Sequence, residues 1–376
     1  MSAITIRHDA LLGNFAVASR DLQQGDLVLE TTPYGISINH DCRKRGCHTC
    51  YTISPYPATY SISCLSCKAV YYCSPHCCDL KQPHHLQHEC TAFIDISNLG
   101  PSYRKHVESA RQIMKERKRG ISHDLAYVYS AGDVQDLARF ILGISSRRFI
   151  ENGNIAHPTY EDVGTLITNR DSLPPLEHLQ LEYLHAFLST FPATSDSTGP
   201  HFADLFTSHY TLHHFINLIC IRTCNGFGLW CPESESIGSS IYPAASYFNN
   251  SCQPNLMRVT GLLSHSRICA SRHGTSIVTF VANEPVLRFY ALHAIRRDEP
   301  LFHSYIDLTL PAKERRSQLK EGYYFDYSAR PPGYRDGNAD DAKAIHTACS
   351  SSDTPLVDKC HPASPRLQQH LNKRPK

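Results

Sequence analysis

The sequence predicts a mixed α+β fold, in which a β-rich domain is split by a small metal-binding module and a helical insert. Three observations support this prediction. Nine of the 16 cysteines lie between Cys42 and Cys90, and a helical periodicity follows them. Strand-like segments lie before the cysteines and after the helical residues. The 376 residues suffice for one large domain or for two to three smaller ones. From about Pro331, apolar residues become scarce, which predicts a disordered tail.

The composition is that of an ordinary soluble protein. Hydrophobic residues make up 41% and charged residues 19%, and the formal net charge of +2 gives no reason to expect direct nucleic-acid binding. The N-terminal stretch carries His8 and Asp9 where a signal peptide needs an unbroken apolar run. No stretch approaches the roughly 18 apolar residues of a membrane span. We therefore expect an intracellular protein of the nucleus or cytoplasm, with no membrane partner.

The cysteine-rich block has the spacing of a metal site. In a reducing compartment, clustered cysteines are more often metal ligands or catalytic groups than disulfides. A C-x2-C pair directs two thiolates at one tetrahedral ion, and two such pairs complete a closed structural zinc site. Four ligand pairs therefore predict two structural zinc ions. The predicted ligands are Cys47, Cys50, Cys64, Cys67, Cys73, Cys77, His85 and Cys90.

The distances between these pairs predict which of them share an ion. Thirteen residues separate the first pair from the second, and five separate the second from the third. This spacing suits an interleaved arrangement, in which pairs one and three hold one zinc and pairs two and four hold the other. Cys42 and Cys78 stand outside the pattern and are expected to be bystander thiols. The alternative for the whole block is a set of free thiols packed as small hydrophobic side chains.

The segments around the block predict strands before it and helices after it. Residues 11–35 alternate and turn like a small β-meander, with Gln24 and Gly25 at a hairpin bend. Helical spacing follows in residues 103–118 and 134–142, and again through Leu176, Leu179, Tyr183 and Phe187, all expected in the core. Further strands are expected at residues 276–282, 288–293 and 301–306.

The cysteine block resembles the MYND zinc finger, including Tyr72 before the third pair and the closing residues His88 to Cys90. The family closes with H-x3-C, whereas His85 stands five positions before Cys90. His85 keeps the family's distance from Cys77, so the resemblance favours it, with His84 and His88 as alternatives. A proline-rich peptide is the partner that we expect for such a finger.

Two later stretches, SYFNNSCQPN (residues 246–255) and DEPLFHSYID (residues 298–307), resemble the SET domain of protein lysine methyltransferases. Taken alone, the first is an ordinary polar loop and the second an ordinary strand. Their order relative to GNFAVASRDLQQGDLVLE, CNGFGLW and RRSQLKEGYYFDY resembles the SET-and-MYND family, whose finger splits the SET domain. The resemblance implies an N-terminal SET part at 1–46, a finger at 47–90, a helical SET insert at 91–240, the C-terminal SET core with a degenerate post-SET region at 241–330, and a tail at 331–376.

The resemblance implies an S-adenosylmethionine-dependent protein-lysine N-methyltransferase, whose partner is a protein substrate with an exposed lysine. Tyr305 and Tyr323 would be the catalytic residues that line the lysine channel. A dry aromatic channel that ends at a sulfonium disfavours the ammonium form of lysine, both by burial and by like charge. The implied cofactor-binding residues are Gly13, Asn14, Asn169, Asn225, Ser246, Asn249, Asn250 and Phe325, the last of them near the adenine.

The sequence departs from the family pattern at several of these motifs. Phe15 replaces the second glycine of the opening motif, and Asn250 replaces a histidine. The three post-SET cysteines that would join Cys252 around a third zinc are replaced, so we expect two zinc ions and not three. The replacing residues are Tyr327, Ala329 and Pro332. The alternative function is a weakly active or inactive SET-like scaffold that binds proline-rich peptides through its finger.

Overall fold

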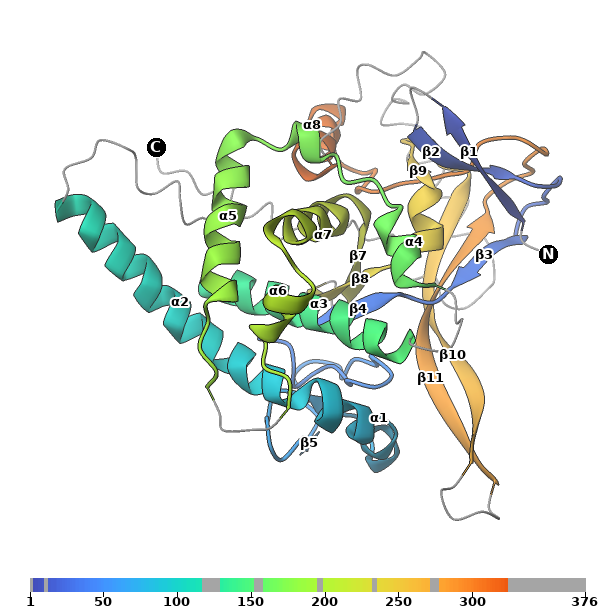
Figure 1. The fold of residues 1–376 in the computed structure, drawn as a ribbon. Coiled ribbons are helices and arrows are strands. Elements are labelled where there is room, and N and C mark those ends of the chain that lie inside the picture. The colour runs from blue at the N-terminus through green and yellow to red at the C-terminus, as the bar shows by residue number, and fades with distance from the viewer. Residues whose placement is uncertain are drawn as a thin grey trace.

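The structure, a computed structural model, describes residues 3–9, 13–116, 129–151, 158–194, 199–231, 235–270 and 277–323. Phe325, the three residues that replace the post-SET cysteines, and the predicted tail lie outside the described residues. Figure 1 shows helices gathered on one side of the molecule and most strands on the other, with the finger below the helices.

The described strands form several small sheets. The hairpin of β1 (Ile4–Asp9) and β2 (Gly13–Ala18) is antiparallel. A second sheet has the order β4-β8-β7, made by Gly35–Ile38, Ser236–Ile241 and Gly226–Trp230. A third has the order β10-β11-β3, made by Leu256–Ala270, Ile277–Ala291 and Leu27–Thr31. The short parallel pair β9–β12 (Asn249–Asn250, Phe302–His303) and the finger pair β5–β6 (Ile62–Ser63, Tyr71–Tyr72) complete them.

The helices begin in the finger. Helix α1 (Pro75–His88) starts after Ser74, whose side chain accepts the Cys77 N–H, and Pro75 occupies the first turn, where no backbone donor is needed. The other helices are α2 (Cys90–Glu116), α3 (Ala131–Glu151), α4 (Tyr160–Gly164), α5 (Pro175–Ser189), α6 (Asp204–Ser208), α7 (Leu212–Asn225) and α8 (Ala312–Tyr323), with 3-10 turns η2 (Arg170–Ser172) and η3 (Pro243–Tyr247). None of the described helices is both long enough and apolar enough to cross a membrane.

The predicted β-meander is wrong, although its strands exist. Strands β2, β3 and β4 belong to three different sheets. The bend at Gly25 is present, with φ +85°, but the chain around it bonds to distant residues, since Leu22 exchanges backbone hydrogen bonds with Ile295 and the Gly25 N–H donates to Ala291. Alternation assigns side chains to faces and carries no information about which segment is the neighbour. Likewise, the strands expected at 276–282 and 288–293 form the single strand β11.

The buried face of α5 also differs from the prediction. Leu176, Leu179 and Tyr183 are exposed, whereas Phe187 is buried. The core side of the helix carries Leu181, Leu184 and Leu188 instead. The two sets have the same i, i+3, i+7 spacing, so periodicity identifies the helix but does not choose between its two apolar stripes.

Three apolar clusters make up the described core. The largest joins the finger cysteines to α2, α3, α5 and α7, so the finger packs on the helical part. The second lies among the sheets around Phe248 and Phe289, and the third is a small cluster of Cys252, Ile306, Leu319 and Tyr323. Strand β8, from the end of the predicted helical insert, pairs with β4 on one side and with β7 on the other, and helix α3 contacts β4.

Candidate metal centres and active site

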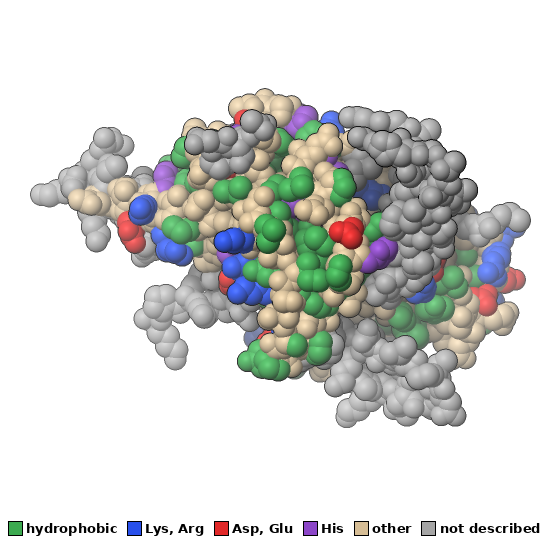
Figure 2. Space-filling view, turned by 90° about the horizontal axis from the view of Figure 1, so that it is seen from below, with side chains coloured by type: hydrophobic (Ala, Val, Ile, Leu, Met, Phe, Trp, Pro, Cys, Tyr) green, Lys and Arg blue, Asp and Glu red, His purple; other side chains and the backbone are tan. Residues whose placement is uncertain are grey.

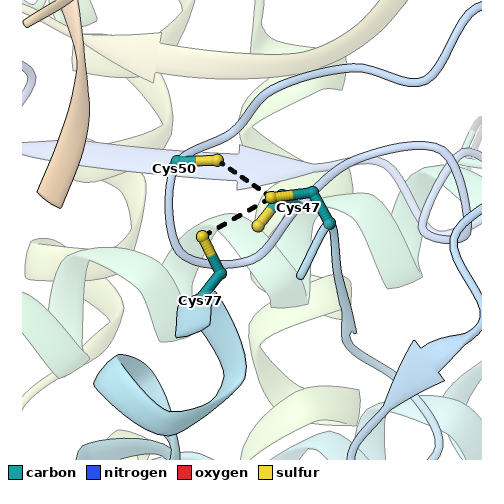
Figure 3. Close-up of side chains that lie close together, drawn as sticks. Cys47, Cys50 and Cys77 are labelled. Atoms are coloured by element: carbon teal, nitrogen blue, oxygen red, sulfur yellow. Dashed lines mark hydrogen bonds between the residues drawn. The ribbon is translucent and has the colours of Figure 1, made fainter. Parts of the chain in front are cut away.

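The eight predicted ligands gather into two clusters of four. Cys47, Cys50, Cys73 and Cys77 form one, and Cys64, Cys67, His85 and Cys90 form the other, with the ligand atoms of each within 4.8 Å of one another. This is the interleaved order. In Figure 3 the labelled side chains of Cys47, Cys50 and Cys77 point toward a common centre. Cys42 and Cys78 lie outside both clusters.

The spacing of the ligand atoms fits a tetrahedral zinc ion. Cys50 Sγ lies 3.7 Å from Cys73 Sγ, which lies 3.5 Å from Cys77 Sγ; Cys64 Sγ lies 3.7 Å from Cys90 Sγ. Zinc–sulfur bonds of 2.3 Å in tetrahedral geometry put sulfurs about 3.8 Å apart. Four thiolates, or three thiolates with one imidazole, are the donor sets of structural zinc sites. Both clusters are therefore consistent with zinc.

Two backbone turns hold the C-x2-C pairs. The residue after each second cysteine, Tyr51 or Lys68, has a left-handed backbone with φ of 58° or 52°. Its N–H returns to the carbonyl of the first cysteine, at 2.9 Å for Cys47 and 3.0 Å for Cys64. This turn directs both side chains of a pair to the same side. The other half of each cluster comes from the residues at the start of α1, from His85 near its end, and from Cys90 at the start of α2.

The electrostatics favour thiolates at the first cysteine of each pair. A hydrogen bond from the Cys50 side chain lowers the pKa of Cys47 to about 5, and one from Cys67 lowers the pKa of Cys64 to about 3. Burial opposes both shifts. Thiolate is the form that ligates metal, so the lowered pKa values of Cys47 and Cys64 favour metal binding.

His85 is the histidine that the structure brings to the second cluster. Its Nε2 lies 3.4 Å from Cys67 Sγ, and its Nδ1 lies 3.1 Å from Glu89 Oε2. A carboxylate on Nδ1 sets the tautomer that leaves Nε2 for a metal. The two alternatives point elsewhere: His84 Nε2 lies 2.6 Å from Ser146 Oγ, and His88 stacks on Phe149.

A second site lies where α7, η3, β10, β12 and α8 meet. It is a cavity of about 20 Å³, which is room for about one water molecule. Four of the residues predicted for catalysis or cofactor binding lie together in its wall: Asn225, Ser246, Tyr305 and Tyr323. The remaining lining residues are Cys224, Gly226, Phe227, Ala245, Arg258 and His303.

The two predicted catalytic tyrosines contact each other, with ring centroids 4.9 Å apart and planes tilted by 40°. The Tyr305 hydroxyl donates to the Phe248 carbonyl at 2.9 Å, and its backbone N–H donates to Asn250 Oδ1 at 2.9 Å. The Asn169 amide donates to the Tyr323 carbonyl at 2.9 Å. Burial raises the pKa of Tyr323, so this phenol stays neutral at any physiological pH.

Several predicted cofactor-binding residues lie outside the cavity lining: Gly13, Asn14, Asn169, Asn249 and Asn250. Asn14 is exposed and contacts His8, while Asn169 and Asn250 hold the backbones of the two tyrosines. The Asn225 amide donates to the carbonyls of Ile167 and Ile221 at 2.8 and 3.0 Å, so only its oxygen is left for a ligand. The roles assigned to these residues stay predictions.

Among the lining residues that sequence reasoning did not assign are two with polar side chains, His303 and Arg258, and it also missed Asn255 behind the cavity. His303 stands two positions before Tyr305, and this spacing was the available signal that their side chains lie close together. Asn255 is buried; it accepts the Phe302 N–H and donates to the Pro300 carbonyl, both at 2.8 Å. It therefore fixes the segment that leads into Tyr305.

Comparison with known proteins identifies this arrangement. Residues 13–306 match the SET domain family, and the two cysteine–histidine clusters lie between the SET segments. The chain belongs to the SET and MYND domain-containing family. The chain is 24% identical over 346 residues to a SET and MYND domain-containing protein of Dictyostelium discoideum. The matched region covers 84% of this chain and 77% of that protein.

Other relatives of this SET and MYND protein are longer. It is 24% identical to the N-lysine methyltransferase SMYD2-A of Danio rerio over 82% of its own length but only 55% of that protein's. A solved SET domain of LSMT, bound to lysine and AdoHcy, covers 86% of this chain and 53% of that one, at 12% identity and a TM-score of 0.33. That structural similarity is too low to support any inference about this site.

A SET domain implies S-adenosylmethionine, and the cavity wall fits only its reacting end. The wall combines aromatic rings with the Asn225 oxygen and the Ser246 hydroxyl, which donates to the Tyr242 carbonyl at 3.1 Å. Such rings tolerate a sulfonium, and oxygens attract it. The enclosed volume is far smaller than the whole molecule, so its adenosine and amino-acid parts would lie outside this cavity.

Proposed function

We propose that this protein is an S-adenosylmethionine-dependent protein-lysine N-methyltransferase. The observation that carries the proposal is the contact between Tyr305 and Tyr323 at the wall of a small cavity, in a chain of the SET family. The substrate class that suits such a site is a protein with an accessible lysine, because a narrow aromatic cavity admits a single long side chain tip-first.

The cavity suits methyl transfer because the reaction needs alignment and exclusion of water more than covalent catalysis. S-adenosylmethionine, when bound, supplies a methyl group on a sulfonium. The substrate amine must be neutral, although free lysine has a pKa near 10.4. The buried rings of Phe227 and Tyr323 and the half-buried ring of Tyr305 exclude water and so disfavour the ammonium form. The Tyr305 oxygen, whose hydrogen is directed at Phe248, accepts an N–H of the amine and orients its lone pair.

Access to the cavity depends on the two tyrosines. Their rings are in contact, so a lysine side chain can enter between them only after they separate. Tyr323 ends α8, and its carbonyl is held by Asn169. Movement at the end of α8 is therefore the step that we expect substrate binding to require.

A scaffold function is the second candidate, and exposed apolar side chains on the finger favour it. Tyr56 is 72% exposed and Leu65 88%, and Leu86 is exposed as well. Figure 2, which views the molecule from below, shows hydrophobic side chains gathered at several places on this face. Exposed aromatic and aliphatic side chains are what proline-rich peptides dock against.

Two measurements separate the candidates. Calorimetric titration of the full chain with S-adenosylmethionine should show saturable binding at about one site per chain. Mass spectrometry should then detect added methyl groups on lysines of a protein mixture, and the Tyr305→Phe variant should lose that signal. Absence of cofactor binding by a folded, zinc-loaded chain would reject the methyltransferase and leave the scaffold.

A further inference from the structure

His303 is a buried imidazole in the lining of the candidate active site. It is 4% exposed, and its Nδ1 lies 3.0 Å from the Ser304 carbonyl, so Nδ1 carries the proton and donates. Its Nε2 is then an acceptor, and it has no hydrogen-bond partner within the described part of the chain. Burial, followed by the charge of Arg258, lowers the pKa of His303 to about 3, so the ring stays neutral.

Packing fixes the orientation of this ring. Its centroid lies 4.9 Å from that of Tyr305, 5.3 Å from Phe289 and 6.1 Å from Phe227, nearly parallel to the last at 18°. The Tyr305 hydroxyl already donates to Phe248 and can only accept from a ligand in the cavity. The cavity thus offers two acceptors from neighbouring side chains, and a neutral amine has two N–H donors beside its lone pair.

We propose that His303 orients the substrate amine for attack, its Nε2 accepting one of the N–H groups of the amine. This inference rests on the proposed methyltransferase function. The lone pair of the nitrogen attacks the methyl carbon, the carbon–sulfur bond breaks, and its electrons pass to sulfur. The methylated ammonium then releases its proton to water once it leaves the site.

The acceptor is tested by pairing His303→Phe with His303→Gln. Phenylalanine keeps the ring but removes the acceptor, so kcat should fall about 10- to 100-fold, while glutamine, with its amide oxygen, should restore part of it. Cofactor affinity should not change, and the exposed His293→Gln is the control. Equal kcat for His303→Phe and wild type would reject the acceptor role.

A measurement on the wild-type chain separates this inference from the proposed function. With ¹⁵N-labelled histidine, n-butylamine added at alkaline pH should shift the Nε2 resonance of His303 and leave that of His293 in place. A shift in a chain that methylates no lysine would reject the methyltransferase but keep the amine site. A chain that methylates lysine without any shift would reject the amine site alone.

Discussion

The finger and the candidate active site differ in how completely the chain builds them. In the finger, eight side chains from 44 consecutive positions converge on two centres, and each of the two C-x2-C pairs is held by a tight turn. In the active site, the lining comes from segments up to 99 residues apart in the chain, between Cys224 and Tyr323, and it leaves a cavity of about 20 Å³. The ligands of the finger already lie around two centres, whereas the small cavity of the active site must widen before a substrate enters.

The polar groups of the two regions also differ in whether they already have partners within the protein. The cluster thiols are directed at one another, so an ion satisfies all of them together. In the active site, the amides of Asn169 and Asn225 already donate to backbone carbonyls and act as supports for the walls. A preformed metal site therefore contributes to the folding of its module, while the active site relies on a framework folded around it.

The largest expected effect comes from breaking the second cluster. Cys64→Ser with Cys67→Ser should remove about one zinc per chain and loosen residues 47–90, because structural zinc contributes on the order of 10 kcal/mol or more to such modules. Metal analysis and limited proteolysis measure both effects. Cys42→Ser with Cys78→Ser, outside the clusters, is the control. Unchanged zinc content in the first variant would contradict the cluster assignment.

Breaking the active site should affect catalysis and spare the fold. Tyr305→Phe removes the hydroxyl that donates to Phe248 from a residue of the cavity lining, so methyl transfer should fall about 10- to 1000-fold. Affinity for S-adenosylmethionine should change little, since the ring remains. The half-buried Tyr290, outside the cavity, gives the control variant Tyr290→Phe. If wild type and Tyr305→Phe transfer methyl groups at the same rate, the proposed role of the hydroxyl is lost.

The same contrast explains what could be predicted from the sequence. The zinc ligands are visible because a C-x2-C turn places two thiols locally, whatever the rest of the chain does. Strand partners are not local: β2 and β3 alternate as expected, but their neighbours are β1 and β11. In α5, two leucine stripes of equal spacing leave the buried face undetermined until α6 and α7 pack on one of them.

The type of a residue also does not tell which groups its side chain will hydrogen-bond in the folded protein. Asn169 was expected at the cofactor because it resembles a family asparagine, and in the structure its amide donates to the Tyr323 carbonyl. His303 and Arg258 carried no motif that marks them, and only the meeting of β10 with β12 brings them to Tyr305. A motif therefore marked Tyr305, the tyrosine proposed to be catalytic, more readily than it marked the residues around it.

A smaller effect on zinc binding should follow from removing the carboxylate that contacts His85 while keeping His85 itself. Burial raises the pKa of the Glu89 carboxyl, but Lys81 and His48 hold it well below its usual range, so Glu89 faces His85 as a carboxylate. Glu89→Gln should weaken zinc at the second cluster about 10- to 100-fold, as is typical for partners of a ligating histidine. Competition with a chelator measures this, with the exposed Glu108→Gln on α2 as control. A loss confined to the first cluster would contradict the pairing of Glu89 with His85.

The smallest expected effect tests whether the active-site region also holds a metal. Cys252 is buried with Ile306, Leu319 and Tyr323, and it belongs to no metal-like cluster in the ranges that the structure describes. One thiolate cannot hold a structural zinc, which needs four ligands. Cys252→Ser should therefore leave the metal content at two and cost only about 1 kcal/mol of stability, the scale of one hydroxyl buried among apolar groups. Truncation after Arg330 should also leave two. Native mass spectrometry counts the ions: a wild-type stoichiometry of three that falls to two in either variant would show a third metal site beside Tyr323, and the active-site region would then resemble the finger more closely than its closed, apolar packing implies.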